Sequence, residues 1–196
     1  MKENPRMRAV ELDNNDQPIE GTERILWDSR SMAVAIIPIA KTSDGQYEFL
    51  VEKRGPGCPD NIGKYVMPCG YLNRGESLRE AGAREMYEET GLKINPKNLK
   101  FAGINDDPAE NRENVTVRFV ALLDEKDITE KLQSGEINTD TASRGGEGNE
   151  CDDITLIPFN SIDDYEFAFN HDKLMKKTVE NLDAIVSGSY YWDSLC

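Results

Sequence analysis

Residues 70–92 read GYLNRGESLREAGAREMYEETGL, a glycine-containing loop followed by a helical pattern, and this stretch decides the fold. Ser77 followed three positions later by Glu80 forms the S-x-x-E capping box, in which each side chain satisfies a backbone N–H at a helix start. Gly91 is typical of the left-handed position that ends a helix. The stretch therefore predicts a helix over residues 76–90 that follows directly on a loop.

The second half of this helix gathers Glu85, Glu88 and Glu89 near one face, since residues three and four apart are neighbours on a helix. Such like-charge pairs each cost about 0.2–0.5 kcal/mol in water, and burial raises that cost. We expect Arg84, the nearest basic residue, to point away from the centre of this face and to neutralise at most one charge. Hard oxygen ligands without sulfur or imidazole favour Mg²⁺ or Mn²⁺ as the missing counterion. The alternative is an ordinary solvated helical face.

The overall composition favours one globular domain with a substantial core, because the chain has 196 residues of which 38% are hydrophobic. Its 37 acidic and 23 basic residues give a formal net charge of −14. This charge disfavours binding to nucleic-acid backbones or to anionic membranes, so we expect no DNA binding and no membrane association. A small anionic substrate would need local cations.

The cysteines and the apolar runs argue for a reducing, intracellular setting. The four cysteines form no C-x-x-C pair, which suggests neither a zinc site nor a disulfide framework. The longest apolar run, residues 33–40, is far too short to span a bilayer, and no signal-peptide pattern opens the chain. We therefore expect a cytoplasmic protein.

Along the chain, strand and helix patterns mix, which predicts an α/β fold. Residues 1–30 are polar and are interpreted as an N-terminal arm or edge strands, with short strands near 8–12 and 25–27. Residues 31–188 form the main domain, in which the apolar run MAVAIIPI, followed by a turn and YEFLVEKR, predicts a hairpin with a first strand buried on both faces. Residues 189–196 are a C-terminal tail.

After the 76–90 helix the pattern continues as two strands, a long polar insert, a strand and a helix. The insert, near residues 124–150, could begin with a short helix, and its part from residue 139 onward is expected to be mobile. An amphipathic pattern predicts one helix over 170–188. The strands are expected within the segments LKFAGIN (99–105), NVTVRFVALL (114–123) and DDITLIPF (152–159).

The spacing of residues 70–92 fits the pattern G-x5-E-x7-R-E-U-x-E-E-x-G-U, where U is a bulky aliphatic residue. This resembles the signature of the Nudix hydrolases, and the order of the flanking elements is also similar to that family. The resemblance implies an α/β/α sandwich with a mixed β-sheet between helices. The specified positions are filled by Gly70, Glu76, Arg84, Glu85, Met86, Glu88, Glu89, Gly91 and Leu92.

The resemblance also implies a chemistry, the divalent-metal-dependent hydrolysis of a diphosphate linkage in a nucleotide derivative. By similarity, Glu85, Glu88 and Glu89 would be metal ligands and catalytic residues, with Glu89 or a neighbour also acting on the attacking water. The Gly70 carbonyl would be a further metal ligand, which explains a glycine where backbone must approach an ion.

The resemblance also implies supporting roles for two further motif residues, Glu76 and Arg84, and for two residues outside the motif, His171 and Cys69. Glu76 would orient water or the helix carboxylates, and Arg84 would pair with a carboxylate as a structural anchor. His171, the only histidine, would be structural, by capping or packing. Cys69 departs from the family pattern, because many relatives have a second glycine there, and its effect would lie in the shape of the loop.

Three residues outside the motif are candidates for contact with the reacting groups. By similarity, Glu150 would be a general base or an additional metal ligand, with Glu147 as the competitor; the alternative is that both simply solvate a loop. Lys53 and Arg54 end the strand before the motif and are candidates to bind substrate phosphates, since Arg can do so bidentately. A solvated strand end is the alternative for these two.

The substrate of such an enzyme is a nucleoside diphosphate linked to another group, with ADP-ribose or a nucleotide sugar slightly favoured. Pro108 lies 16 residues past Leu92, a spacing that resembles a marker of ADP-ribose-hydrolysing members. The alternatives are a pyrophosphatase that sanitises nucleoside triphosphates, a non-catalytic nucleotide-sensing module, and an isomerase of isoprenoid diphosphates on the same fold. We also expect a homodimer, with the arm and the last helix as interface elements.

Overall fold

The computed structural model describes residues 6–9, 13, 17–22, 24–27, 30–146 and 148–190. The chain divides into two compact units, Met1–Ser31 and Met32–Cys196. In the first unit, β1 (Arg6–Ala9) pairs antiparallel with β2 (Arg24–Trp27). Short strands were expected near 8–12 and 25–27, and their pairing with each other was not predicted. The second unit carries everything that follows.

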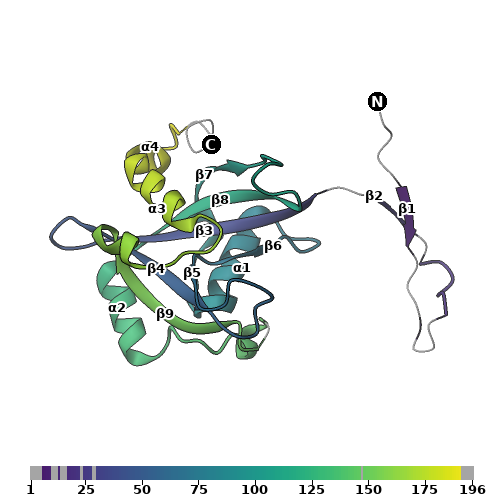
Figure 1. Ribbon diagram of the computed structural model, residues 1–196, viewed down its shortest axis with the longest axis horizontal. Coiled ribbons are helices and arrows are strands. Elements are labelled where there is room, and N and C mark those ends of the chain that lie inside the picture. The colour runs from purple at the N-terminus through teal and green to yellow at the C-terminus, as the bar shows by residue number, and fades with distance from the viewer. Residues whose placement is uncertain are drawn as a thin grey trace. The chain divides into compact units, whose positions relative to one another are not determined.

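The second unit is organised around one sheet, which has seven strands among the described residues. The strand order is β5-β4-β3-β8-β7, with β6 added to β3 and β9 added to β4 (Figure 1). The expected hairpin is confirmed, since β3 and β4 pair antiparallel with Ile39 opposite Phe49. The strands are β3 (Ser31–Lys41), β4 (Tyr47–Arg54), β5 (Tyr65–Val66), β6 (Cys69–Tyr71), β7 (Lys100–Asn105), β8 (Asn114–Leu123) and β9 (Cys151–Pro158).

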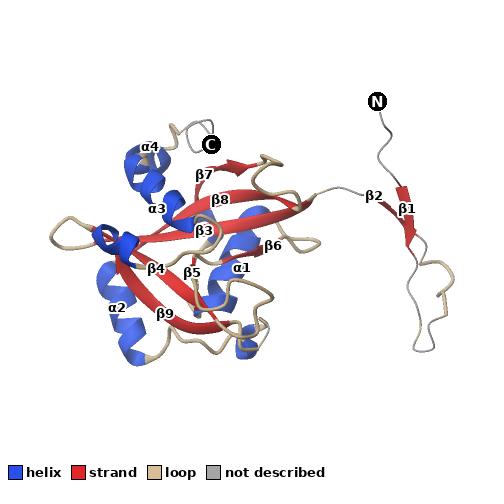
Figure 2. Cartoon of the chain, in the orientation of Figure 1, coloured by secondary structure: helices blue, strands red, loops and turns tan. Residues whose placement is uncertain are grey.

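Helices cover both faces of this sheet (Figure 2). Together with the mixed sheet, this arrangement confirms the expected α/β/α sandwich. The helices are α1 (Leu78–Thr90), α2 (Glu125–Ser134), α3 (His171–Glu180) and α4 (Leu182–Ser187), and the 3-10 turns are η1 (Pro96–Asn98), η2 (Ala142–Arg144) and η3 (Phe159–Asp164).

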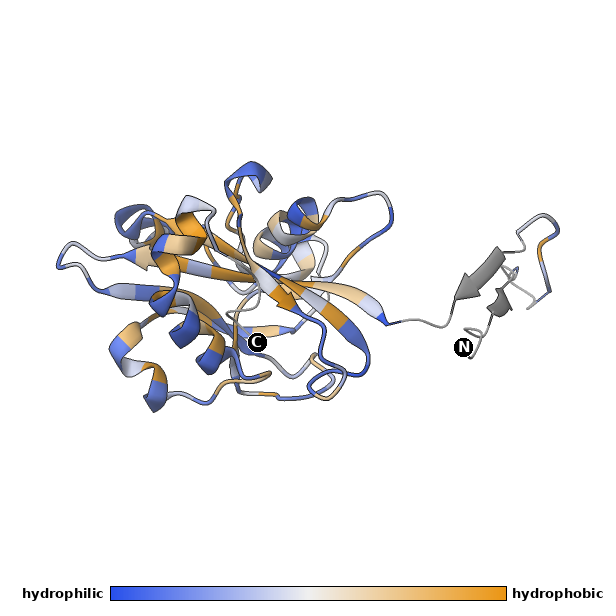
Figure 3. Ribbon diagram, turned by 90° about the horizontal axis from the view of Figure 1, so that it is seen from above, coloured by the Kyte–Doolittle hydropathy of each residue, from blue (hydrophilic) through white to orange (hydrophobic). Residues whose placement is uncertain are grey.

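Strand β3 shows why the layers form, because it is buried on both faces as its apolar run predicts. Side chains alternate along a strand, so Val34 and Ile36 enter the core shared with α1 and α2. Ile37 and Ile39 enter the second core, shared with α3 and α4. In Figure 3 the hydrophobic colour is concentrated on the strands of the sheet, whereas the loops are mostly hydrophilic.

Helix α1 begins and ends where its sequence predicts, to within two residues. The Ser77 side chain accepts the Glu80 N–H while the Glu80 side chain accepts the Ser77 N–H, which is the capping box. Gly91 takes the left-handed conformation with φ 82° and donates its N–H to the Tyr87 carbonyl. The carboxylates of α1 are therefore held on a helix fixed at both ends.

Two segments differ from the sequence prediction. The helix expected over 170–188 is broken into α3 and α4 at Asn181, whose side-chain amide donates to the Lys177 carbonyl and so competes with the helical hydrogen bonds. The polar insert does begin with a helix, α2, but its later part is not a loose loop. It forms η2 and packs against α1 through Arg144. Among the described residues, no helix is both long and apolar enough to cross a bilayer.

Candidate active site

Gly70 lies in β6 opposite Val34 of β3, where the backbone passes directly beside α1. A Cβ atom at position 70 would clash with the Glu85 carboxylate, and would lie 2.7 Å from its Oε2. Only glycine therefore lets this carboxylate rest against the β6 backbone. The Gly70 backbone and the Glu85 side chain, expected to serve one metal site, are brought together.

Arg84 binds three carboxylates at once, which corrects the expectation that it neutralises at most one. Its Nη1 donates to Glu85 Oε1 at 2.7 Å and to Glu88 Oε2 at 2.8 Å. Its Nη2 and Nε donate to the two oxygens of Glu76 at 2.8 and 3.1 Å, and Nη2 also reaches the Tyr71 carbonyl. The side chain is long enough to bend back along its own helix, so its position in the sequence did not limit its reach.

These contacts set the charge state of the clamp around Arg84. Hydrogen bonding from Arg84 lowers the pKa of Glu76, and the Glu76, Glu88 and Glu85 carboxylates together raise the pKa of Arg84. Burial raises the pKa of Glu85, although Arg84 opposes the shift. Glu76 also accepts the Asn73 N–H at 2.6 Å, so it connects the loop to the helix. Its observed partners are Arg84 and backbone.

Glu89 lies outside the Arg84 clamp and takes a different partner. Its Oε2 accepts a hydrogen bond from the backbone N–H of Cys69 at 2.9 Å. This contact uses the backbone of Cys69 and does not depend on the cysteine side chain. Burial raises the pKa of Glu89 well above its usual range, and the charges of Glu52 and Glu85 raise it further. Burial likewise raises the pKa of the Cys69 thiol.

Glu150 is placed by a contact between two loops. The Gly55 N–H donates to the Glu150 carbonyl at 2.6 Å, and the Gly57 N–H donates to the Asn149 carbonyl at 2.8 Å. A Cβ at Gly57 would lie 2.6 Å from the Gly148 carbonyl oxygen, so the two loops meet backbone to backbone. A Cβ at Gly145 would lie 3.4 Å from Glu88 Oε1 and one at Gly146 would lie 3.5 Å from Glu150 Oε2, so the same loop contacts both carboxylates. Its competitor Glu147 falls outside the described residues.

Lys53 and Arg54 lie at the end of strand β4, where the pairing with β9 is irregular. Arg54 donates from Nε and Nη2 to the backbone and side chain of Asp60 at 3.0 Å, and its guanidinium lies 5.2 Å from the centre of the Phe169 ring. The register of β4 against β9 shifts between Lys53 and Arg54, so regular alternation does not assign these two side chains to faces of the sheet. The structure thus ties Arg54 to Asp60 and Phe169, and the assignment of Lys53 stays a prediction from the sequence.

Comparison with known proteins agrees with this geometry. The family model of the NUDIX domain matches residues 30–178, most of the chain. The chain belongs to the Nudix family. Its intact motif and its curated relatives identify it as a Nudix hydrolase.

Two curated relatives of this Nudix hydrolase carry names that bear on chemistry. An ADP-ribose pyrophosphatase of Methanocaldococcus jannaschii is 26% identical over 146 residues, which are 74% of this chain and 71% of that protein. The NAD-capped RNA hydrolase NudC of Actinobacillus succinogenes is 33% identical over 93 residues, or 46% of this chain and 33% of that protein. Each name states the activity of the relative that carries it.

A solved structure confirms the fold. The NUDIX domain of Shewanella oneidensis NrtR, crystallised with ADP-ribose, superimposes with a TM-score of 0.56 and 18% identity. The match covers 79% of this chain and 90% of that domain. NrtR has also been crystallised with a 27mer DNA. At this identity the likeness shows the Nudix fold alone.

Two residues of the site were missed by sequence reasoning. Glu52 is buried in β4, with 5% of its surface exposed, and shares the strand face of Leu50. A charged residue two positions after a core leucine was the sequence signal that could have identified Glu52.

Arg144 donates from Nε to the Glu88 carbonyl at 3.1 Å and from Nη2 to the Glu89 carbonyl at 3.3 Å. It supplies the cation that the last turn of α1 lacks, and no sequence signal pointed to it.

The glutamate carboxylates and the Gly70 carbonyl are oxygen donors that suit a hard divalent cation. In the described structure the side chains do not converge on one cation position. Within residues 30–146 and 148–190, no three His, Cys, Asp or Glu side chains form a ready-made metal-binding group. Arg84 holds Glu85 and Glu88, so these carboxylates would have to turn from it toward a cation. The close approach of Glu85 to the Gly70 backbone and the burial of Glu52 fit an oxygen-lined site.

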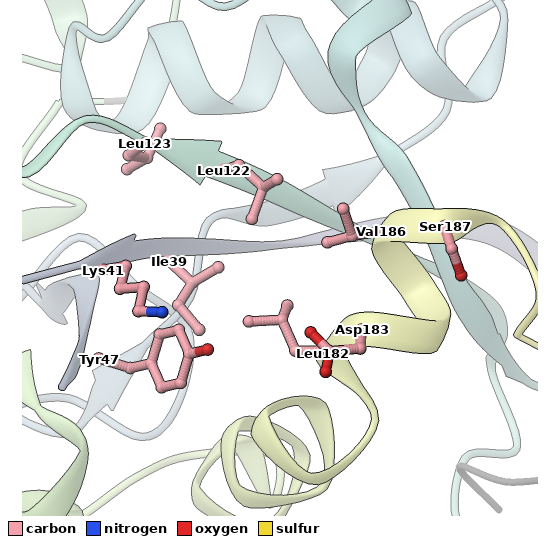
Figure 4. Close-up of a pocket in the computed structure, with 9 residues that line it drawn as sticks. All are labelled: Ile39, Lys41, Tyr47, Leu122, Leu123, Leu182, Asp183, Val186 and Ser187. Carbon is pink, nitrogen blue, oxygen red and sulfur yellow. The ribbon is translucent and has the colours of Figure 1, made fainter. Parts of the chain in front are cut away.

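A separate hollow on the α4 side of the sheet lacks this chemistry (Figure 4). Its volume is about 430 Å³, and its walls come from the ends of β3, β4 and β8 and from α4. Apolar side chains such as Ile39, Leu122 and Val186 make up much of the lining, with Lys41 and Asp183 as its charged residues. The carboxylates lie on the other face, and they define the candidate site.

Proposed function

We propose that this Nudix hydrolase cleaves a diphosphate linkage in a nucleotide derivative with the help of Mg²⁺ or Mn²⁺. Within that class we favour a nucleoside diphosphate linked to a sugar, and ADP-ribose above all. The observation that carries the proposal is the set of glutamates assembled by Arg84 beside Gly70. The choice of ADP-ribose is supported by the curated relative of that activity, which aligns over most of both chains.

The metal would be held by Glu85, Glu88 and Glu89 with the Gly70 carbonyl. When bound, a divalent cation supplies neutralisation of phosphate charge and lowers the pKa of bound water. Nudix hydrolases generally need such a cation. In our proposal Arg84 keeps the carboxylates in place before the cation enters, and Glu76 keeps Arg84 in place.

Proton transfer is assigned to the carboxylates that Arg84 does not hold. Glu150 would accept a proton from the attacking water at its carboxylate, because the contact between the loops at Gly55 and Glu150 holds it at the edge of the cluster. Glu89 is the alternative base, because Arg84 does not hold it and burial raises the pKa of its carboxyl well above the usual range. A base on either residue would act beside the helix carboxylates.

Substrate phosphates are assigned to Arg54, with Lys53 as a second candidate. The Arg54 Nε and Nη2 are occupied by Asp60, and its Nη1 has no hydrogen-bond partner in the described part of the chain. An arginine fixed in this way keeps one donor for a phosphate oxygen. Lys53 is the neighbouring residue at the end of β4 and offers a second cation for the phosphates.

A substrate panel tests the proposal. ADP-ribose, nucleotide sugars, dinucleotides and nucleoside triphosphates are incubated with Mg²⁺ or Mn²⁺, and release of nucleoside monophosphate, phosphate and pyrophosphate is measured. We expect AMP from ADP-ribose, loss of activity in EDTA and recovery with added metal. Pyrophosphate release from triphosphates would favour the sanitising alternative. Binding of ADP-ribose without any product, with or without metal, would favour a nucleotide-sensing module and contradict the proposal.

A cytoplasmic location and a homodimer that uses the N-terminal arm and last helix remain predictions from the sequence. The absence of DNA binding is likewise a prediction, made from the net charge of −14. Size-exclusion chromatography with light scattering tests the dimer, and a mass of one chain would contradict it.

A further inference from the structure

Glu52 is a carboxylate that the Nudix motif does not include, in the interior of the sheet. Its Cα lies opposite Ile154 of β9 and Val66 of β5, so strands flank it on both sides. Its exposed fraction is 5%, comparable to core side chains. Burying a carboxylate without partners is costly, and in proteins such groups are normally paired or bind metal.

One oxygen of Glu52 has no such partner. Among the described residues, its Oε2 is buried without a hydrogen bond. The nearest cation acting on it is Arg54, whose guanidinium is already held by Asp60 and lies against Phe169. A buried acceptor left open in this way calls for an explanation in a native fold.

The same carboxylate lies on the face of the sheet that α1 covers, where the glutamates proposed to bind the metal also lie. Its strand face is that of Leu50, which packs in the core with Ala81 and Met86 of α1. The charges of Glu150 and Glu85 act on Glu52, and the charge of Glu52 acts on Glu89. Carboxylates from β4, from α1 and from the loop before β9 thus interact electrostatically, and Arg84 holds Glu85 among these four.

We propose that Glu52 contributes its carboxylate to the divalent-cation site. The open Oε2, buried on the α1 face of β4, is the oxygen that would face the cation. A divalent ion there would resolve the one unpaired oxygen and the repulsion among the carboxylates together. The proposal rests on the proposed function only for the presence of a divalent metal, and it extends the ligand set beyond the motif.

The test measures Mn²⁺ binding directly, without substrate. Metal-free wild type, Glu52→Gln and Glu52→Asp are titrated with Mn²⁺ by electron paramagnetic resonance of the free ion and by isothermal titration calorimetry. The matched control is Glu48→Gln, a partly buried glutamate of the same strand and face whose charged neighbours are Glu125 and Asp44. We expect Glu52→Gln to weaken Mn²⁺ binding by about 10- to 100-fold, and Glu52→Asp and the control to weaken it less.

Folding is followed in the same samples by the midpoint of thermal unfolding with and without Mn²⁺. Because Gln keeps the shape and removes the charge, metal-free Glu52→Gln should be at least as stable as wild type, while Mn²⁺ should raise its midpoint less. Equal Mn²⁺ affinity in wild type and Glu52→Gln would overturn the proposal. Glu52-dependent Mn²⁺ binding in a protein that hydrolyses no nucleotide would uphold it and overturn the proposed function instead.

Discussion

On the α1 face of the sheet, Glu52, Glu85 and Glu89 carry raised pKa values, whereas on the α3 face the buried His171 is neutral and satisfied. His171 Nδ1 accepts the Met67 N–H at 3.0 Å, as a structural histidine would, and burial lowers its pKa to about 3. Burial is also the first cause of the shifts in the three glutamates, and it raises the pKa of Glu52 to about 7. The buried histidine of the α3 face has a hydrogen-bond partner, whereas on the α1 face one oxygen of the buried Glu52 has none among the described residues.

The two faces therefore respond to protons with opposite signs. A carboxyl whose pKa is raised by folding binds more protons when folded, so its unfavourable effect is complete above that pKa and is relieved by acid. A histidine whose pKa is lowered by folding favours the folded state above the unfolded-state pKa, and this contribution is lost as pH falls toward the folded value. Both faces carry a large apolar core, so the α1 face differs from the α3 face in the carboxylates that it buries.

The largest expected effect is on turnover. Glu89→Gln removes a carboxylate assigned to both metal binding and proton transfer, and should lower kcat for the best substrate about 10²- to 10⁴-fold. Glu48→Gln in strand β4 is the matched control and should leave kcat close to wild type. Steady-state kinetics with saturating Mn²⁺ measures both, and full activity in Glu89→Gln would remove it from the site.

The next effect is on the stability of the α1 face. Arg84→Ala leaves Glu76, Glu85 and Glu88 without their shared cation, so the free energy of unfolding should fall by about 3 kcal/mol. Lys126→Ala breaks an exposed pair with Glu130 and should cost at most about 0.5 kcal/mol. Urea unfolding of the metal-free proteins compares them, and similar losses would mean that Arg84 does not hold the cluster.

The α3 face is tested through the pH dependence of stability. The folded-state pKa of His171, about 3, lies below an unfolded value of about 6.5, so acid favours the unfolded chain. Between pH 7 and pH 5 wild type should lose about 2 kcal/mol relative to His171→Gln, which cannot take up this proton. Unfolding curves of the two proteins that change in parallel with pH would contradict the buried neutral state.

The smallest effect belongs to the insert. Arg144→Ala removes hydrogen bonds to the Glu88 and Glu89 carbonyls and should cost about 1 kcal/mol, with faster hydrogen exchange in the last turn of α1. Arg144→Lys keeps the charge but not the fork of donors, and should fall between wild type and Arg144→Ala. Unchanged exchange in both variants would show that the insert does not support α1.

The fold and the motif part of the site were predictable, because both are written in local patterns. The apolar run of β3 requires burial on both faces, and Ser77, Glu80 and Gly91 mark the ends of α1. The break at Asn181 was not predictable from apolar periodicity, which continues across it. A single side-chain hydrogen bond decides that break.

The rest of the site depends on contacts between distant segments, to which sequence spacing gives no guide. Arg144 meets α1 only after the insert has folded back, and Glu150 is positioned by two glycines of another loop. Arg84 was misjudged because its reach was inferred from its helical position, without the flexibility of a long side chain. Glu52 was not predicted as a site residue, because it lies within a strand pattern and outside the Nudix motif.

The central claim is that the carboxylates buried on the α1 face bind a divalent cation. It is tested most directly by calorimetric titration of Mn²⁺ into the metal-free protein and into Glu85→Gln/Glu89→Gln. We predict that wild type binds Mn²⁺ saturably and that its affinity rises with pH, because binding displaces carboxyl protons. We predict that the double variant loses this binding. Equal binding by the two proteins, or none by a folded wild type, would contradict it.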